Sequence, residues 1–171
     1  EKNQTITSDL VKKHQADLGV AFDGDFDRCF LFDENGRFIS GEYVTALISQ
    51  VFLEKEKDVK IIHDPRIIWN IKNVVESSGG TAIVSKTGHA YMKSAMRKNK
   101  AIYGGEFSAH HYFRQFSYCD SGMLPWLIVW ELLSKKRSKI SKIIEHYRKC
   151  FPSSGEKNFR LKDPNNCINV I

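Results

Sequence analysis

The apolar residues near the start of the chain occur in short continuous or alternating runs, which are typical of β-strands. Asn35-Gly36 lies between two such runs and predicts the tight turn of a hairpin. A more polar segment precedes them and is interpreted as the last turns of a helix. The elements predicted for this part are a helix end at 9–14 and strands at 16–22, 28–32 and 37–39.

Farther along the chain the spacing changes to that of helices. From Val44 to Phe52 the apolar residues recur at intervals of three and four, the period of one apolar helix face. Between 59 and 103 the predicted order is strand, helix, strand, helix, strand, which favours βαβ units. The predicted fold class is α/β, a mixed sheet with helices packed on it, plus part of a preceding domain. The predicted helices cover about 42–56, 67–79, 90–98, 122–134 and 139–149, and the strands 59–63, 81–85 and 101–103.

The composition is that of a globular protein with a modest positive charge. Its 171 residues, 42% of them apolar, allow one or two domains with a real core. The net charge is +6, and the dense basic cluster at 135–139 is more typical of a solvated helix junction than of a nucleic-acid surface. We therefore expect no nucleic-acid partner, whereas the positive charge suits an anionic substrate such as a phosphate ester.

The cysteines and the apolar runs indicate where in the cell the protein is expected. Four cysteines show no CxxC pairing, which favours reduced thiols and a cytoplasmic protein. No signal peptide or membrane-length apolar run is present, so no membrane association is expected. The chain starts at Glu1 without a methionine and stops within a pattern at Ile171, which suggests a piece cut from a longer protein.

The segment around residue 25 concentrates carboxylates. Asp23, Asp25 and Asp27 stand at alternate positions, with Gly24 among them and Arg28 at the end. Either an extended or a looped backbone brings these three charges within several ångströms of one another, so positive charge must compensate them. Arg28 supplies one such charge, and a divalent cation is the natural source of the rest. All-oxygen ligands favour Mg²⁺, Mn²⁺ or Ca²⁺ over Zn²⁺.

Two other interpretations fit part of this pattern. Asp and Gly are common turn residues, so a solvated turn without metal is one alternative. The other is an EF-hand, with Glu34 at the twelfth loop position. An EF-hand needs Gly at the sixth position, where Arg28 stands, and its flanks are helices whereas these flanks are strand-like. The EF-hand is therefore set aside.

Three further loops follow predicted strands, which is where ligands bind in α/β sheets. His89 lies at a predicted helix start, where the helix dipole favours the neutral imidazole that a general base needs. Lys86 in the same loop and Arg66 in the loop after 59–63 are candidates for binding phosphate oxygens. Glu106 and Ser108, after the 101–103 strand, are candidates for binding sugar hydroxyls.

Each of these residues also has a plainer interpretation, as an exposed histidine, a surface charge or part of a Gly-rich turn. His110 and His111 are adjacent, and adjacent side chains point apart, so they are not expected to bind one metal ion together. Taken together, a hard-metal loop, two phosphate-binding cations, a histidine base and a hydroxyl-binding loop indicate phosphoryl transfer on a sugar phosphate.

Three segments then resemble motifs of one enzyme family, the α-D-phosphohexomutases. Asp23-Gly24-Asp25-Phe26-Asp27-Arg28 resembles their DGDxDR metal loop, and Lys86-Thr87-Gly88-His89 resembles their KTGH motif. Gly105-Glu106-Phe107-Ser108-Ala109-His110 resembles the GEMSGH sugar loop. The three occur in the family's order, and the wording from His63 to Asn70 and from Ala109 to Gly122 is similar to bacterial phosphomannomutases that feed GDP-mannose synthesis.

The resemblance implies a four-domain enzyme of which this chain holds the middle. Residues 1–38 would be the end of domain two with the metal loop, 39–150 domain three, and 151–171 the linker and the start of domain four. Domain one and the rest of domain four would lie elsewhere in the same polypeptide. The implied reaction interconverts mannose 6-phosphate and mannose 1-phosphate through a hexose 1,6-bisphosphate, which also activates the enzyme.

The resemblance also implies roles for the candidate residues. Asp23, Asp25 and Asp27 would bind one Mg²⁺ together with a phosphoserine, and Arg28 would contact the phosphoryl group. His89 would be the acid/base, and Arg66 stands where relatives often carry Lys. The phosphohexose substrate would be held by Glu106, Ser108, His110 and Lys86.

This sequence departs from the family pattern in several places. Phe107 replaces the usual Met, a conservative change, and Arg66 for Lys favours phosphate binding over acid/base use. No TASHNP-like serine loop and no RxSGTEP-like phosphate loop occur in these residues, so the chain alone is expected to be inactive. The alternatives are a phosphoglucomutase, a phosphoglucosamine mutase, or a non-catalytic module that binds Mg²⁺ or a sugar phosphate.

Overall fold

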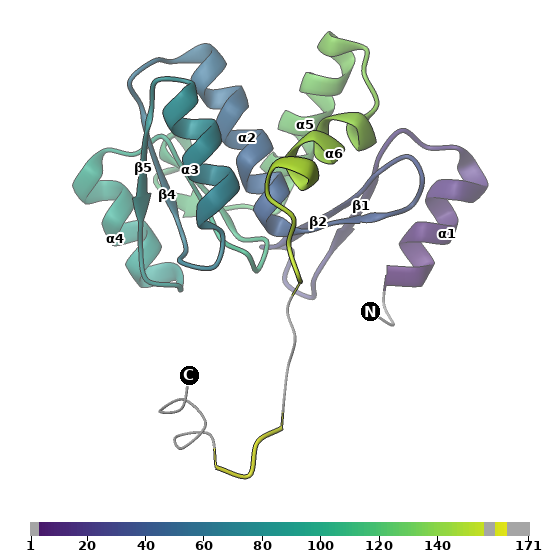
Figure 1. The fold of residues 1–171 in the computed structure, drawn as a ribbon, viewed down its shortest axis with the longest axis horizontal. Coiled ribbons are helices and arrows are strands. Elements are labelled where there is room, and N and C mark those ends of the chain that lie inside the picture. Colours follow the sequence, from purple (N-terminus) through teal and green to yellow (C-terminus); the bar gives the residue numbers. More distant parts are fainter. Residues whose placement is uncertain (1–3, 156–159, 164–171) are drawn as a thin grey trace.

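The strands on either side of the Asp run form a small antiparallel sheet. The computed structural model describes residues 4–155 and 160–163. In it, β1 (Gly19–Phe22), β2 (Cys29–Phe32) and β3 (Phe38–Ile39) pair in that order. Gly36, with φ of +73°, makes the β2–β3 turn, a conformation that favours glycine. Helix α1 (Gln4–His14) lies beside this sheet with Val11 buried (Figure 1).

A second, five-stranded sheet carries most of the chain, in the order β5-β4-β6-β7-β8. The parallel strands are β4 (Lys60–His63), β5 (Thr81–Val84) and β6 (Tyr103–Gly105), and β7 (His111–Phe113) and β8 (Cys119–Asp120) add antiparallel to them. The sheet is therefore mixed, and the α/β class is confirmed.

Helices cover both faces of this sheet (Figure 1). Alternate strand residues face opposite sides: Ile61 lies in the larger core cluster and Ile62 in the smaller one. Helices α2 (Gly41–Lys55) and α3 (Ile68–Ser77) cover the Ile61 side, whereas α4 (His89–Asn99) covers the Ile62 side with Met92 and Met96.

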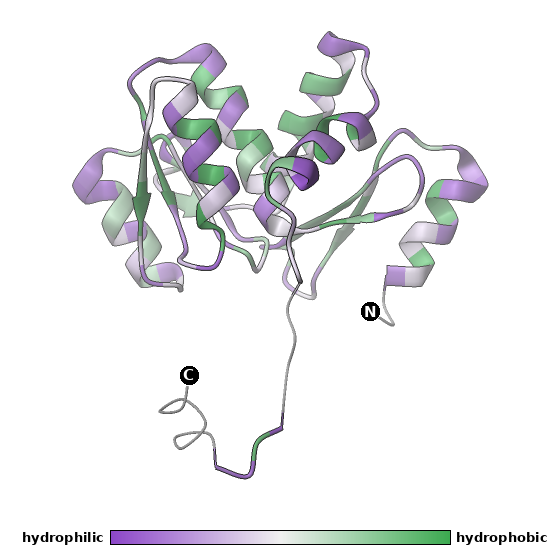
Figure 2. Ribbon diagram, viewed as in Figure 1, coloured by the Kyte–Doolittle hydropathy of each residue, from purple (hydrophilic) through white to green (hydrophobic). Residues whose placement is uncertain are grey.

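Helix α2 is buried around most of its circumference because it lies between the sheet and two later helices. Its buried residues include polar Thr45 and Ser49 as well as Leu47 and Ile48. Helices α5 (Met123–Lys136) and α6 (Ile140–Cys150) contact it and add Val129 to the same core. Figure 2 shows the strands mainly in the hydrophobic colours, with hydrophilic residues collected on the outer faces of the helices.

The helices predicted from the apolar period are all present, and the hairpin turn at Asn35-Gly36 is also found. Two predictions were incomplete. The strand expected at 101–103 lies at Tyr103–Gly105, because Ala101 and Ile102 lead into it from α4. Strands β7 and β8 were not predicted, since segments this short carry too few residues for a period to appear.

The remaining described residues add two facts. No helix in residues 4–155 and 160–163 is long and apolar enough to span a bilayer. The predicted linker at 152–155 has no regular secondary structure, whereas 156–159 and 164–171, where a fourth domain was expected to start, lie outside the described residues.

Candidate active site

The Asp run forms the loop between β1 and β2, which pair up to Phe22 and Cys29. Arg28 closes this loop on Asp23: its Nε donates to Asp23 Oδ2 at 2.5 Å and its backbone N–H to Oδ1 at 3.2 Å. Burial by itself would raise the pKa of Asp23, but the hydrogen bonds and charge of Arg28 outweigh it, so this pKa is lowered. Asp23 is therefore a carboxylate held in a fixed orientation.

The three aspartates of this loop converge as the sequence suggested. Asp23, Asp25 and Asp27 each offer one oxygen, and these oxygens lie within 4.8 Å of one another. Burial and the negative charges of Asp25 and Asp23 raise the pKa of Asp27, although His110 acts in the opposite direction. Asp27 Oδ1 is buried and has no hydrogen-bond partner among the described residues. An all-oxygen donor set that includes a buried oxygen without a hydrogen bond fits a hard cation such as Mg²⁺.

Two histidines from segments that adjoin the second sheet face this loop. His89 begins α4 and His110 immediately precedes β7, and their rings meet edge to face with centroids 4.6 Å apart. Asp27 Oδ2 lies 3.9 Å from His89 Nε2 and 3.5 Å from His110 Nε2. The backbone joins the two parts as well, since Cys29 N–H donates to the Ala109 carbonyl at 3.3 Å. Segments that resemble three separate motifs therefore meet at one place.

Glu106 holds the loops of the second sheet together. Its side chain is 1% exposed, and Oε1 accepts from the Gly88 N–H at 2.6 Å while Oε2 accepts from the Tyr112 hydroxyl at 3.0 Å. His110 Nδ1 lies 3.2 Å from the same Oε2. Burial alone would raise the pKa of Glu106, but its bonds to His110, Gly88 and Tyr112 lower it. Glu106 is thus an anion engaged mainly with the protein itself.

Ser108 and His110 are the half-buried members of the sugar-loop candidate. Ser108 Oγ and His110 Nδ1 are 2.9 Å apart. Burial lowers the pKa of His110, but the hydrogen bond to Glu106 and the charge of Asp27 more than offset it, and the net shift is upward. The charged form of His110 is favoured because carboxylates lie on both sides of its ring.

Arg66 and Lys86 lie on the loops beside this centre. Arg66 donates to the buried Asp64, with Nη2 2.7 Å from Oδ2, and its guanidinium lies over the Phe107 ring at 5.4 Å. Asp64 Oδ2 also accepts the Phe107 N–H at 2.8 Å, which ties this loop to the sugar-loop candidate. Lys86 is exposed and lies over the ring of Tyr91.

The sequence analysis missed two charged residues of the site. The Asp120 side chain is 8% exposed, and its Oδ2 lies 3.3 Å from His89 Nδ1. Lys93, one turn along α4, pairs with Asp120 Oδ1 at 2.9 Å. Asp120 lies in the 109–122 segment that resembles the family, but neither residue was given a role in the site. The pairing of β7 with β8 brings Asp120 next to His89.

His111 points away from its neighbour into the core. It is fully buried, with Nδ1 2.6 Å from the Tyr103 hydroxyl, and burial lowers its pKa to about 3. His110 therefore faces the Asp loop, whereas His111 is part of the core and takes no part in the candidate site.

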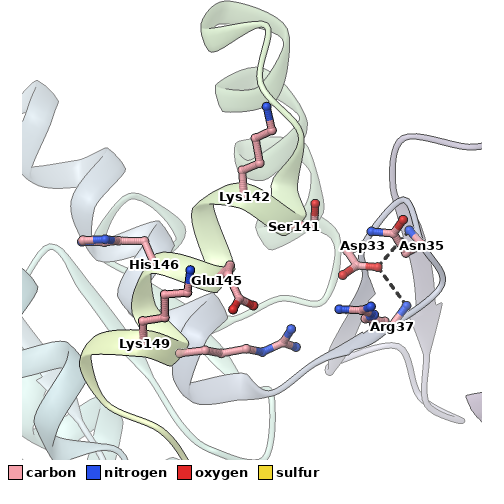
Figure 3. Close-up of a pocket in the computed structure, with 9 residues that line it drawn as sticks. Asp33, Asn35, Arg37, Ser141, Lys142, Glu145, His146 and Lys149 are labelled. Atoms are coloured by element: carbon pink, nitrogen blue, oxygen red, sulfur yellow. Dashed lines mark hydrogen bonds between the residues drawn. The ribbon is translucent and has the colours of Figure 1, made fainter.

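A pocket of about 480 Å³ lies elsewhere, between the β2–β3 turn and α6 (Figure 3). It combines basic side chains such as Arg37 and Lys149 with the carboxylates of Asp33 and Glu145. Asp33 is used locally, since its Oδ1 accepts the N–H groups of Asn35 and Arg37, both at 2.9 Å. None of the candidate site residues lines this pocket.

Comparisons with known proteins point in the same direction as this geometry. Residues 40–150 match the family described as phosphoglucomutase/phosphomannomutase, alpha/beta/alpha domain III, and residues 1–36 match domain II of that description. The chain is 60% identical over 157 residues to a phosphomannomutase of Vibrio cholerae, covering 91% of this chain and 34% of the relative. It is 56% identical over 165 residues to a phosphomannomutase of Escherichia coli, covering 96% of this chain and 36% of the relative.

Solved structures agree with the fold. A phosphoglucomutase/phosphomannomutase family protein from Burkholderia thailandensis is similar with a TM-score of 0.78 and 26% identity, covering 83% of this chain and 31% of that one. A phosphomannomutase candidate from Thermus thermophilus shares the fold at a TM-score of 0.79 and 19% identity, covering 87% and 34% of the two chains. The chain spans about a third of the length of the curated relatives it matches.

Proposed function

The chain belongs to the phosphoglucomutase/phosphomannomutase family, and we propose that it is part of a phosphohexomutase that interconverts mannose 6-phosphate and mannose 1-phosphate. The observation that carries this proposal is the meeting of the Asp loop with His89 and His110 across the two sheets. The identity of 55–60% to phosphomannomutases supports mannose as the sugar. A reduced, cytoplasmic protein is part of the same proposal, supported by the free thiols of Cys29, Cys119 and Cys150.

The domain assignment is also a proposal. Residues 1–38 would be the last part of domain two, 39–150 domain three, and 151–171 the linker and the start of domain four. The five-stranded sheet lies wholly after the first boundary, and the small antiparallel sheet ends at it with β3 (Phe38–Ile39), which supports a boundary near this position. The phosphorylated serine and the phosphate-binding loop would come from other domains of the polypeptide.

Asp23, Asp25 and Asp27 are the residues that would hold Mg²⁺. The bound ion would offset negative charge on the phosphoryl group being transferred. Arg28 is committed to Asp23 through Nε, which leaves its terminal N–H groups to donate to phosphoryl oxygens. Asp23 thus orients Arg28, and a bound cation would compensate the remaining negative charge of the three carboxylates.

His89 is the proposed acid/base for the sugar hydroxyl. Its Nδ1 faces the Asp120 carboxylate at 3.3 Å, so Nδ1 carries hydrogen and Nε2 presents the lone pair that accepts a proton. Lys93 fixes Asp120 from the other side at 2.9 Å. Because the His89 side chain is 44% exposed, a substrate hydroxyl can reach it.

The proposed substrate contacts follow from exposure and donor type. Ser108 and His110 are half-buried and present a hydroxyl and an imidazole to a sugar. Glu106 is nearly buried, so a sugar hydroxyl would add to the hydrogen bonds that this carboxylate already accepts. Arg66 and Lys86 would bind phosphate oxygens, and Arg66 is already turned toward the sugar loop by Asp64 and Phe107.

The decisive assay uses the full-length polypeptide that contains this chain. We expect conversion of mannose 6-phosphate to mannose 1-phosphate that requires Mg²⁺ and a hexose 1,6-bisphosphate, and that exceeds the turnover of glucose and glucosamine phosphates. Faster turnover of one of the other two sugars would instead make it a phosphoglucomutase or a phosphoglucosamine mutase. Absence of a serine loop upstream of Glu1, with no turnover of any hexose phosphate, would contradict the proposal and favour a binding module.

A further inference from the structure

One carboxylate oxygen of Asp27 lies between two imidazole nitrogens. Asp27 Oδ2 is 3.9 Å from His89 Nε2 and 3.5 Å from His110 Nε2, whereas Oδ1 is the oxygen near Arg28. Both separations from the nitrogens exceed those of a normal hydrogen bond. One ligand atom from each of Asp27, His89 and His110 lies within 4.8 Å of those of the other two residues.

The outer nitrogens of both rings show how the rings face Asp27. His89 Nδ1 is 3.3 Å from Asp120 Oδ2, and His110 Nδ1 is 3.2 Å from Glu106 Oε2. A carboxylate accepts hydrogen bonds, so each Nδ1 carries hydrogen and each Nε2 faces Asp27, with a lone pair when the ring is neutral and with a second hydrogen when His110 is charged. When both rings are neutral, two lone pairs and a carboxylate oxygen converge there, which is unfavourable unless a cation or a proton lies between them.

We propose that Asp27, His89 and His110 form a binding site for a borderline divalent metal ion such as Zn²⁺ or Co²⁺. Such an ion, bound tetrahedrally with ligands at about 2.0–2.2 Å, separates its ligand atoms by about 3.4 Å. The two distances from Asp27, 3.5 Å and 3.9 Å, would have to shorten by about 0.1 Å and 0.5 Å, and the ligand atoms of the two histidines lie within 4.8 Å of each other. Metal-binding histidines usually donate their second N–H to a carboxylate, as both rings do here.

The ligand chemistry distinguishes this site from the one proposed for Mg²⁺. Imidazole suits Zn²⁺, Co²⁺ and Ni²⁺, whereas Mg²⁺ prefers oxygen ligands. The two sites share Asp27. Asp120 supports His89 from outside, because its other oxygen is paired with Lys93. If the proposed function holds, a metal ion here also occupies the His89 nitrogen that would accept the proton.

Two other places on the chain could bind the same ions and define the controls. His146 and Cys150 stand one turn apart on α6, with Nε2 and Sγ 3.9 Å apart. The Asp loop itself offers oxygens from Asp23 and Asp25. His146→Gln removes the first rival, and Asp25→Asn, at an exposed position, weakens the second.

The test is a titration of the purified chain with Co²⁺ alone, followed by its visible absorption. We expect one equivalent with the intense absorption of tetrahedral Co²⁺, lost in His89→Gln and in His110→Gln but kept in His146→Gln and Asp25→Asn. Asp120→Asn should weaken binding about 10- to 100-fold, because it removes the carboxylate behind His89. Absence of binding, its survival in both histidine variants, or its loss in His146→Gln would overturn the proposal.

A second measurement needs no substitution. With isotope-labelled histidine, Zn²⁺ should shift the Nε2 resonances of His89 and His110 while leaving exposed His14 unchanged. Shifts confined to His146, or no shift at all, would overturn the site. Neither measurement uses a substrate, so a full-length polypeptide without mutase activity would count against the proposed function and not against this site.

Discussion

Glu106 illustrates how one residue can organise a site without being open to solvent. Its carboxylate connects the start of α4, through Gly88, with β7, through Tyr112, and it lies against His110. Burial of a charge is unfavourable unless hydrogen bonds compensate it, and these partners supply them. The charge of Glu106 therefore positions both histidines relative to the Asp loop.

Substitution of Glu106 by Gln keeps the shape of the side chain but replaces one carboxylate oxygen, which accepts a hydrogen bond, with an NH₂ group that can only donate one. We expect a loss of about 2–3 kcal/mol in the free energy of unfolding, because a buried donor or acceptor is left unpaired. Urea denaturation measures this, with Glu76→Gln on the exposed surface of α3 as the control. A loss for Glu106→Gln as small as that of the control would show that the buried network matters little.

The buried histidines predict a dependence of stability on pH. Burial lowers the pKa of His111 to about 3, and it also lowers the pKa of His63. The unfolded chain takes up these protons near pH 6.5, whereas the folded chain resists them. The contribution of these two histidines to stability is therefore full above about pH 6.5 and falls as the pH decreases, by up to about 1.4 kcal/mol per pH unit for each histidine.

Denaturation curves at pH 7.5, 6.5 and 5.5 check this expectation. His111→Asn should be less stable than the parent but should lose less stability between pH 7.5 and 5.5, since one proton-binding difference is removed. His14→Gln, at an exposed position, should follow the parent. Parallel pH dependence in the parent and His111→Asn would contradict the assignment to His111.

At the scale of elements, the Asp loop is shaped by a helix end as much as by its own residues. Gly122, just before α5, packs against the loop backbone: a Cβ there would lie 2.5 Å from the Phe26 carbonyl oxygen and 3.0 Å from that of Arg28. Phe26 itself has a φ of +62°, which is uncommon for a residue with a side chain. Contact with Gly122 thus stabilises a loop conformation that the loop alone would not favour.

Gly122→Ala is accordingly expected to destabilise the chain by about 1–3 kcal/mol, because the neighbouring atoms are backbone and cannot move aside cheaply. Gly24→Ala in the same loop is the matched control, since its Cβ would meet nothing within 4 Å. Thermal or urea denaturation distinguishes the two. Equal stability of both variants would mean that the loop adapts to Gly122→Ala without strain.

At the scale of the whole molecule, the chain holds half of a proposed site. The Asp loop, His89 and the 106–110 loop meet, but the relatives are about three times as long, and the proposed phosphoserine would come from elsewhere. Mg²⁺ usually relies on phosphate or substrate oxygens in addition to carboxylates. The three aspartates alone should therefore bind it weakly.

We expect the isolated 171-residue chain to show no conversion of mannose 6-phosphate and only weak Mg²⁺ binding by calorimetry. The full-length polypeptide, assayed beside it, should be active and should bind Mg²⁺ more tightly once phosphorylated. Turnover by the isolated chain, or tight binding of Mg²⁺ to it, would show that these residues form a complete site.

A helix, strand or turn could be predicted from the sequence when enough neighbouring residues showed its characteristic pattern. Helix α2 was predicted because its apolar residues repeat from Val44 to Phe52, about two and a half turns, and the β2–β3 turn because Gly36 follows Asn35. Strands β7 and β8, of three and two residues, exist only through pairing with their neighbours, so nothing local marks them. Asp120 was missed together with β8 for the same reason.

The sequence by itself determined the α/β class, the helices and the family, since the apolar period and the short motifs are local patterns that survive without a structure. The Asp run at residues 23–28 was likewise recognised from spacing alone. Only the tertiary structure decided that Asp27 lies between His89 and His110, that Glu106 is buried, and that Asp120 stands behind His89. These are contacts between residues far apart in the chain, and burial and charge pairing act on distances in space that no local spacing contains.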